Sequence, residues 1–344
     1  MISHPERQSA SRAPRPTNPR PRPRTSPADT VALAARLTDR DRWITRMLHE
    51  HRVLTTNHLT ALAFPIRKIA LRRLTLLQDH DVVTRFRPLR TRGSAPSHWL
   101  LAPTGATVLA AEAGIDPSEI GYNHRRTLAI AHSLHLAHTL GVADWFTALT
   151  TNHHDGSNGG GAGRVVAWWS QTRCHRLWGD LTRPDAFGRY THHEQILDFF
   201  LEYDLGSTSL PRVAAKLHGY SELARTTGVV TPVLLWVPTT TRETNARQAL
   251  LATWRRLPDP DAVPVATAAA ELLTPTPHPS PAAPVWMPLD TPTPGRLSLR
   301  ELTETWPRRT PPAPDLDTDA TPTTLNGQTM LAAPPPQPRP VDYW

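Results

Sequence analysis

Apolar residues recur at helical spacing in three successive segments between residues 37 and 81. The first, LTDRDRWITRMLHEHR, has Thr38 as its predicted N-cap and acidic residues in its first turn. The second is VLTTNHLTALAF. The third, PIRKIALRRLTLLQDHD, has an apolar set made of Ile66, Ile69, Ala70, Leu74 and Leu77. Two strand-like stretches, VVTRFRPLR and SHWLLA, and a helical TGATVLAAEAG follow. This order predicts a winged helix-turn-helix domain over residues 37–114.

After a glycine-rich loop at 152–163, the pattern changes to strands separated by helices. We expect one long amphipathic helix over 124–149, before the loop. The strand-like stretches RVVAWWS, PDAFGRY and ILDFFLEYDLG come after it, then a helix from Pro211, the strand VTPVLLWVP, a helix over 242–256 and the strand VPVAT. A meander followed by a crossover predicts an α/β domain over 122–268. The fold class expected for the whole chain is therefore α/β, or α+β overall.

Both ends of the chain are rich in proline. The stretch SRAPRPTNPRPRPR predicts a disordered basic arm over 1–36, and the composition predicts a Pro/Thr-rich, largely disordered tail over 269–344. Two short apolar islands in this tail, VWMPLD and LSLRELTETW, are long enough to dock back onto a domain.

The net charge of +8 over 344 residues favours a polyanionic partner, with nucleic acid ahead of an acidic membrane surface. No apolar run approaches the roughly 18 residues that span a bilayer, and we expect no membrane partner. The single cysteine, Cys174, excludes an internal disulfide framework and suits a reducing cytoplasm. The sequence leaves the oligomeric state open.

Basic residues occupy the third predicted helix and the hairpin. In a winged helix-turn-helix the third helix enters the major groove and the hairpin lies along the backbone. A solvated face, or a module that binds protein, would also carry arginines, but this placement favours double-stranded DNA. The predicted DNA-binding residues are Arg67, Lys68, Arg72 and Arg73 on the helix and Arg85, Arg87, Arg90 and Arg92 on the hairpin.

The stretch FFLEYDLGSTSLPRVAAKLHGY places carboxylates and a lysine in an apolar setting. Strand alternation puts Glu202 and Asp204 on one face. Lys216, one of only two lysines, falls in the predicted inward stripe of the next helix. A buried lysine needs an anionic partner, and Asp185 approaches from the preceding strand. One interpretation is a buried ion-pair network that holds the helix on the sheet; another is a catalytic site.

The order Pro184-Asp185, Glu202-Tyr203-Asp204 and Lys216 resembles the restriction-endonuclease-like PD-(D/E)xK core. The resemblance implies magnesium held by Asp185 and Glu202, with Lys216 assisting the attacking water in phosphodiester hydrolysis. Asp204 stands where that pattern has its lysine. A degenerate nuclease core is the third interpretation.

The wider layout over 37–256 is similar to the replication-relaxation family of actinobacterial plasmids and integrated mobile elements. The similarity rests on the motifs LTDRDRWITRML, HRVLTTNHL, LRRL, WWSQTRC, RPDAFGRY and FFLEYDLGSTSLPRVAAKLHGY. It implies a DNA-binding protein that acts in replication, relaxation or mobilisation of its DNA, with replication or transfer proteins as partners. The alternatives are a magnesium-dependent nickase or nuclease that uses Asp185, Glu202 and Lys216, and a winged-helix transcriptional regulator.

Overall fold

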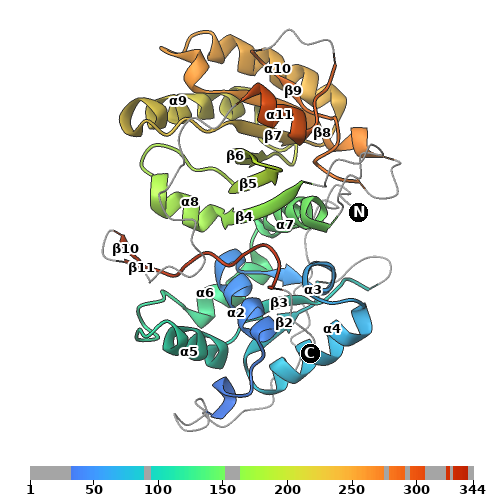
Figure 1. Cartoon of the computed structure of the whole chain (residues 1–344), viewed down its shortest axis with the longest axis vertical. Coiled ribbons are helices and arrows are strands. Elements are labelled where there is room, and N and C mark those ends of the chain that lie inside the picture. Colours follow the sequence, from blue (N-terminus) through green and yellow to red (C-terminus); the bar gives the residue numbers. More distant parts are fainter. Residues whose placement is uncertain are drawn as a thin grey trace. The chain divides into compact units, whose positions relative to one another are not determined.

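The computed structural model describes residues 32–88, 94–151, 163–274, 279–290, 295–306, 323–325 and 328–339 (Figure 1). The chain forms two compact units. The boundary between them falls between Ala143 and Asp144, inside helix α7 (Leu136–Thr151), and the chain from Asp317 onward belongs to the first unit again. The sequence places the start of the second domain earlier, at residue 122. Within the described residues, no helix combines the length and the apolar character that a membrane crossing requires.

The first unit begins with three helices, a pair of strands and a further helix, in the order that the hydrophobic pattern predicts, and with one short strand, β1 (Leu54–Thr55), that the pattern does not predict. In chain order they are α2 (Asp39–His51), β1, α3 (Thr56–Ala63), α4 (Arg67–Asp79), β2 (Val83–Phe86), β3 (His98–Leu101) and α5 (Pro103–Glu112). The strands form an antiparallel sheet in the order β1-β3-β2. Capping boxes at Thr38 and Thr55 begin α2 and α3, as side-chain oxygens accept from otherwise unpaired backbone N–H groups.

The apolar stripe of α4 is narrower than the sequence predicts. Ala70, Leu74 and Leu77 are buried, at the spacing of one helical face. Ile66 and Ile69, which the sequence assigns to the same set, are 53% and 45% exposed. The reason is geometric: Ile66 precedes the helix as its N-cap, and Ile69 lies about 100° around the axis from Ala70. The outer face of α4 therefore carries apolar as well as basic side chains.

The expected continuous helix over 124–149 is broken into two. Helix α6 (His124–Ala129) runs into a short 3-10 turn (Ile130–His132), and Ser133 then adopts an extended backbone before α7 begins. The interruption lets both Ile130 and Leu136 pack in the core of the first unit, against Val53, Phe86 and Leu100. Helical periodicity alone does not reveal this break, because it is determined by packing.

The second unit is built on a six-stranded mixed sheet in the order β4-β5-β6-β7-β8-β9. The antiparallel meander comprises β4 (Arg164–Ser170), β5 (Ala186–His192) and β6 (Gln195–Tyr203). Strands β7 (Val233–Val237) and β8 (Val265–Ala269) continue in parallel, and β9 (Met287–Pro288) closes the edge antiparallel. Helices α8 (Gln171–Trp178), α9 (Leu210–Thr227) and α10 (Thr240–Trp254) connect successive strands. The α/β fold class is confirmed.

Aromatic side chains fill both faces of this sheet. On one face, Phe199 packs against Trp145 from α7, and Trp145 also contacts Trp236 and Trp286. On the other face, Phe200 contacts Trp178 of α8 and Tyr220 of α9. Strand alternation explains why neighbours in sequence belong to opposite layers. Figure 1 shows α9 and α10 on one side of the sheet and α7 on the other.

Part of the predicted tail is packed onto the second unit. Strand β9 pairs with β8, Trp286 is fully buried, and helix α11 (Leu299–Thr305) contacts β6 and buries Leu299 and Leu302. The two apolar islands of the sequence therefore do dock, and a largely disordered tail from residue 269 is not what these segments show. Their apolar side chains are the physical cause.

Candidate functional site

The pairing register of β5 and β6 brings Asp185 and Glu202 side by side. Ala186 is opposite Leu201, so the next pair outward is Asp185 and Glu202. The Asp185 backbone N–H donates to the Leu201 carbonyl at 3.1 Å, and its Oδ2 accepts from the Tyr203 N–H at 2.8 Å. The two predicted carboxylates therefore converge.

Glu202 lies under α9, between the sheet and the helix, and is 4% exposed. Its Oε2 accepts from Lys216 Nζ, and its Oε1 accepts from the Tyr220 hydroxyl. The Lys216 side chain is 41% exposed, so the prediction that it belongs to the buried stripe is wrong. The buried stripe consists of its neighbours Val213, Leu217 and Tyr220; Lys216 lies at its border, and its long side chain reaches in to Glu202.

The electrostatics of this group are dominated by burial. Burial raises the pKa of Glu202 to about 7; Lys216 opposes this rise and Asp185 adds to it. For Lys216, partial burial opposes the charged form, but the carboxylates of Glu202 and Asp185 raise its pKa above the ordinary value. Lys216 therefore stays charged beside the carboxylates and donates a hydrogen bond to Glu202.

Asp204 has a different partner from the one that the sequence suggests. Its Oδ2 accepts from Nε of Arg242 on α10, and the same guanidinium donates to the Thr208 carbonyl at 2.5 Å. Asp204 therefore ties the loop after β6 to α10.

Three residues that sequence reasoning did not assign to the site complete it. Gln171 Nε2 donates to Asp185 Oδ1 at 3.2 Å, Tyr220 bonds Glu202, and Arg242 bonds Asp204. Tyr220 had a sequence signal, because it follows Lys216 by four positions on the same helix. Gln171 and Arg242 had none, since both come from other elements.

The donor set does not fit a magnesium ion as it is arranged here. Both oxygens of Asp185 and both oxygens of Glu202 accept hydrogen bonds from protein donors. Within the described residues, no group of three or more His, Cys, Asp and Glu side chains is placed to hold a metal ion. Magnesium requires several oxygen ligands at short distance, so binding at this point would need Lys216 and Tyr220 to leave Glu202.

The basic residues predicted on α4 divide into two groups. Arg67, Lys68 and Arg72 are exposed on its outer face, and Arg67 donates to Asn57 Oδ1 at 2.6 Å. Arg73 instead bonds both oxygens of the fully buried Asp41 on α2. Although burial opposes it, this guanidinium lowers the pKa of Asp41. Arg73 therefore holds α4 against α2.

On the hairpin, the predicted arginines are partly engaged. The guanidinium of Arg85 lies over the Trp99 ring, 5.3 Å from its centroid, and Arg87 donates to the hydroxyls of Ser94 and Ser97 at 3.2 Å. Arg87 is nevertheless exposed. Arg90 and Arg92 lie outside the described residues, as do residues 1–31 of the basic arm predicted over 1–36.

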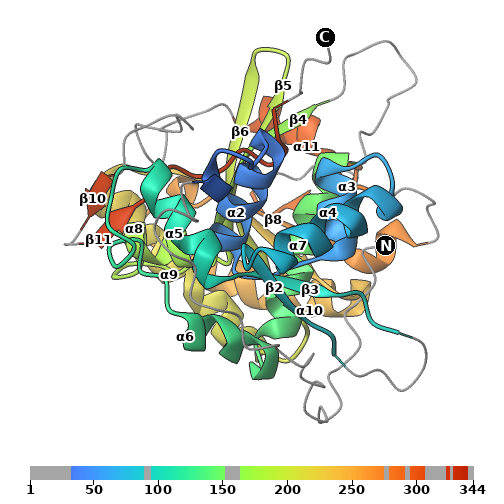
Figure 2. The same cartoon turned by 90° about the horizontal axis from the view of Figure 1, so that it is seen from below.

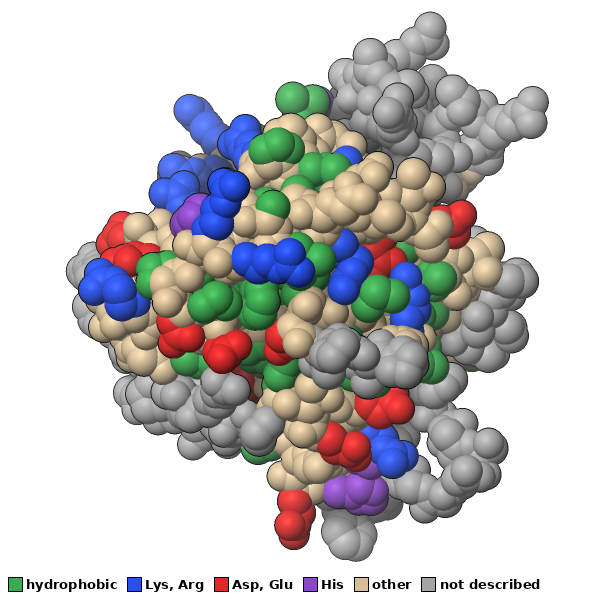
Figure 3. Space-filling view, turned by 90° about the horizontal axis from the view of Figure 1, so that it is seen from above, with side chains coloured by type: hydrophobic (Ala, Val, Ile, Leu, Met, Phe, Trp, Pro, Cys, Tyr) green, Lys and Arg blue, Asp and Glu red, His purple; other side chains and the backbone are tan. Residues whose placement is uncertain are grey.

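The second unit also presents basic side chains. Figure 3 looks onto its α9 and α10 side, where Lys and Arg form a group at upper left and a row across the middle, with Asp and Glu gathered below that row. Arg212, Arg225, Arg255 and Arg256 are exposed on α9 and at the end of α10. An experiment that tests the basic residues of the first unit for binding to a polyanion therefore needs a control variant with the same charge change on the second unit.

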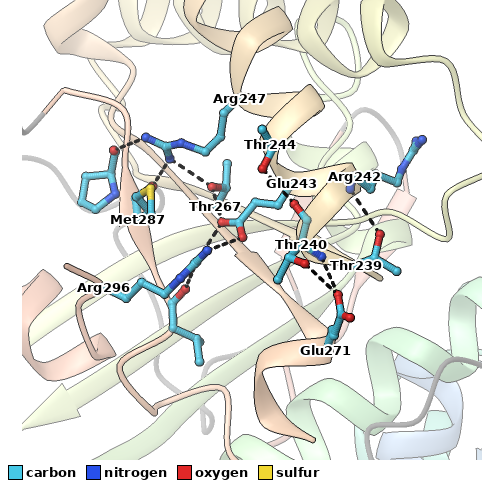
Figure 4. A network of polar contacts seen from close by, with 12 residues as sticks. Thr239, Thr240, Arg242, Glu243, Thr244, Arg247, Thr267, Glu271, Met287 and Arg296 are labelled. Atoms are coloured by element: carbon cyan, nitrogen blue, oxygen red, sulfur yellow. Dashed lines mark hydrogen bonds and ion pairs between the residues drawn. The ribbon is translucent and has the colours of Figure 1, made fainter. Parts of the chain in front are cut away.

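A second buried carboxylate in this unit, which the sequence did not indicate, is Glu243 on α10. It accepts from both Nη atoms of Arg296, at 3.0 and 2.7 Å, and from the Thr267 hydroxyl at 2.7 Å. Arg247 donates to Thr267 and to the carbonyls of Met287 and Pro288 (Figure 4). This network fastens the segment around β9 to α10.

Comparison with known proteins identifies a family for this chain. Neither a curated protein nor a solved structure matches the chain. The model of the family described as "Replication-relaxation" matches residues 46–240, more than half of the 344 residues and across both compact units. The chain belongs to the replication-relaxation family.

Proposed function

We propose that this chain is a DNA-binding protein of a plasmid or integrated mobile element and acts in the replication, relaxation or mobilisation of its DNA. The family name supports a role in replication or relaxation. The proposal that the chain binds DNA is supported by the first unit, whose order of helices and strands suits a winged helix-turn-helix domain that binds duplex DNA.

The observation that carries the proposal is the outer face of α4. Lys68 and Arg72 are four positions apart and exposed, whereas the opposite face is buried in the core. In a winged helix-turn-helix the third helix, which the hairpin follows, enters the major groove, and α4 has that position in the chain order. The exposed Ile66 and Ile69 add apolar surface, which suits contact with thymine methyl groups.

The test compares two charge-reversal pairs with the same change in net charge. Lys68→Glu with Arg72→Glu removes cations from α4, and Arg255→Glu with Arg256→Glu removes two exposed cations from the second unit. We expect the α4 pair to weaken duplex binding by at least about tenfold and to lower the salt slope by about two, because two phosphate contacts are lost. Fluorescence anisotropy across a salt series measures both quantities.

The Arg255/Arg256 control should stay within about twofold of wild type. Equal weakening by both pairs would mean that net charge alone drives binding, and no weakening by the α4 pair would remove the proposed helix contact. Circular dichroism verifies that each variant is folded.

The convergence of Asp185, Glu202 and Lys216 favours a second candidate, a metal-dependent nickase or nuclease. The engaged carboxylate oxygens argue against it. Incubation of supercoiled plasmid with protein, in magnesium or in EDTA, decides between the two. Nicking that needs magnesium and disappears in Glu202→Gln, but persists in Glu222→Gln on the exposed face of α9, would establish the enzyme. If wild-type protein leaves the supercoiled plasmid intact in magnesium, the nickase or nuclease function is excluded.

A further inference from the structure

A proline-rich segment near the C-terminus, residues 331–339 (LAAPPPQPR), contacts the first unit. The indole Nε1 of Trp43 on α2 donates to the Pro335 carbonyl at 2.8 Å, across 292 positions of sequence. Pro334 and Pro336 on either side are buried, and Trp43 is only 5% exposed. In both Figures 1 and 2 the dark red segment passes beside α2. The contact therefore combines this hydrogen bond with a buried proline on each side of Pro335.

The chemistry of the segment determines its shape. Each proline ring holds φ near −65°, and a residue that precedes proline is pushed away from helical geometry. Ala333, Pro334 and Pro335 all precede a proline. The segment is thus biased toward an extended polyproline II strand, which makes no internal hydrogen bonds and keeps its carbonyls available. It loses little conformational freedom when it binds.

Trp43 is suited to such a strand. Proline lacks an N–H, so a polyproline strand offers carbonyl acceptors and apolar rings, and the indole supplies a donor and a flat apolar face. Its position is fixed, because Ile44 and Met47 on the same helix are fully buried and a capping box begins α2 at Thr38. An aromatic surface with a pre-positioned donor is the feature by which proline-rich ligands are recognised.

We propose that the surface around Trp43 is a polyproline II recognition site, and that residues 331–339 of the same chain are its ligand. The segment acts as an intramolecular ligand at high effective concentration, so it competes with any proline-rich peptide added from outside. Substitutions that weaken the binding of residues 331–339 should therefore leave the surface around Trp43 accessible to an added peptide of the same sequence.

The experiment uses the full chain and a fluorescein-labelled LAAPPPQPR peptide, with anisotropy as the readout. The variant Pro334→Ser, Pro335→Ser, Pro336→Ser should bind the peptide at least about tenfold more tightly than wild type, because the internal competitor is weakened. Adding Trp43→Phe to this variant should reduce peptide affinity about fivefold, since one hydrogen bond is lost.

A peptide in which the three prolines are replaced by alanine provides a control that does not depend on folding of a protein variant. It should not bind. Equal binding of the proline peptide to wild type and to the triple-serine variant would overturn the proposal, as would equal binding of the alanine peptide. Light scattering should give a mass near 38.2 kDa for the wild type. A dimer that becomes a monomer in the triple-serine variant would overturn the assignment to the same chain.

Discussion

Two buried glutamates of the second unit, Glu202 and Glu243, lie in the layer between the sheet and the helices and are neutralised by different partners. Glu202, Leu235 and Thr267 occupy one row across β6, β7 and β8. Glu202 points from one end of that row toward α9, and Glu243 reaches down from α10 to Thr267 at the other end. Their exposed fractions are similar, 4% and 1%.

The two glutamates differ in the side chains that bond them. Glu243 is held by a two-pronged arginine and a threonine, a fixed geometry that satisfies both oxygens. Glu202 is held by a tyrosine and by a lysine that is 41% exposed, a flexible point charge open to solvent. A buried carboxylate is therefore not in itself the mark of a reactive site. The partner decides how rigidly the carboxylate is held and whether solvent reaches the cation beside it.

The largest effect is expected where the arginine is removed from Glu243. Arg296→Ala leaves a buried carboxylate without its cation, and we expect a loss of about 4 kcal/mol in the free energy of unfolding, measured by urea denaturation. Arg300→Ala is the matched control in the same segment, because Arg300 is 58% exposed and lies 3.9 Å from Glu304. It should cost about 0.5 kcal/mol or less. Equal losses would show that Glu243 has no special dependence on Arg296.

A smaller, pH-dependent effect is expected at Glu202. Its pKa rises from an ordinary value of 4.5 to about 7 in the folded protein. The folded state therefore binds this proton more tightly than the unfolded chain, so the stabilisation is complete below about pH 4.5 and is lost as pH rises to about 7. Glu202→Gln removes the titration. Its free energy of unfolding relative to wild type should rise by about 3 kcal/mol between pH 4.5 and 7.5.

Urea unfolding at a series of pH values measures this difference. Glu222→Gln, exposed on the same helix and paired with Arg225, should show no such rise. A flat difference between wild type and Glu202→Gln would mean that Glu202 titrates normally.

The smallest effect is expected at Lys216. In Lys216→Met the pKa of Glu202 should rise further, because the opposing cation is gone. We expect a stability loss of about 1 kcal/mol at pH 8, as for a partly solvent-screened ion pair, and almost none at pH 5, where Glu202 is protonated. Lys68→Met, at the only other lysine, should show no pH dependence. Equal losses for Lys216→Met at both pH values would contradict the pairing with Glu202.

Local chemistry in the sequence predicted much of the fold. Thr38 is a side-chain cap where its position before an apolar helix indicated one. Strand alternation predicted that Glu202 and Asp204 share one face, and in the structure they bond side chains of α9 and α10. The inward stripe of α9 at Val213, Leu217 and Tyr220 follows from helical spacing. These features depend on a few neighbouring residues, so periods of 2 and 3.6 are enough to reveal them.

Only the tertiary structure decided which charged groups meet. Arg73 belongs to the predicted basic helix, yet it bonds Asp41, 32 positions away. Arg296 bonds Glu243 across 53 positions, and Trp43 bonds Pro335 across 292. Each choice depends on the desolvation of a polar group, which is set by elements packed around it and not by its sequence neighbours. The sequence by itself determined most of the elements and many of the faces they bury. Packing in the folded chain determined the break between α6 and α7 and the partners of the buried charges.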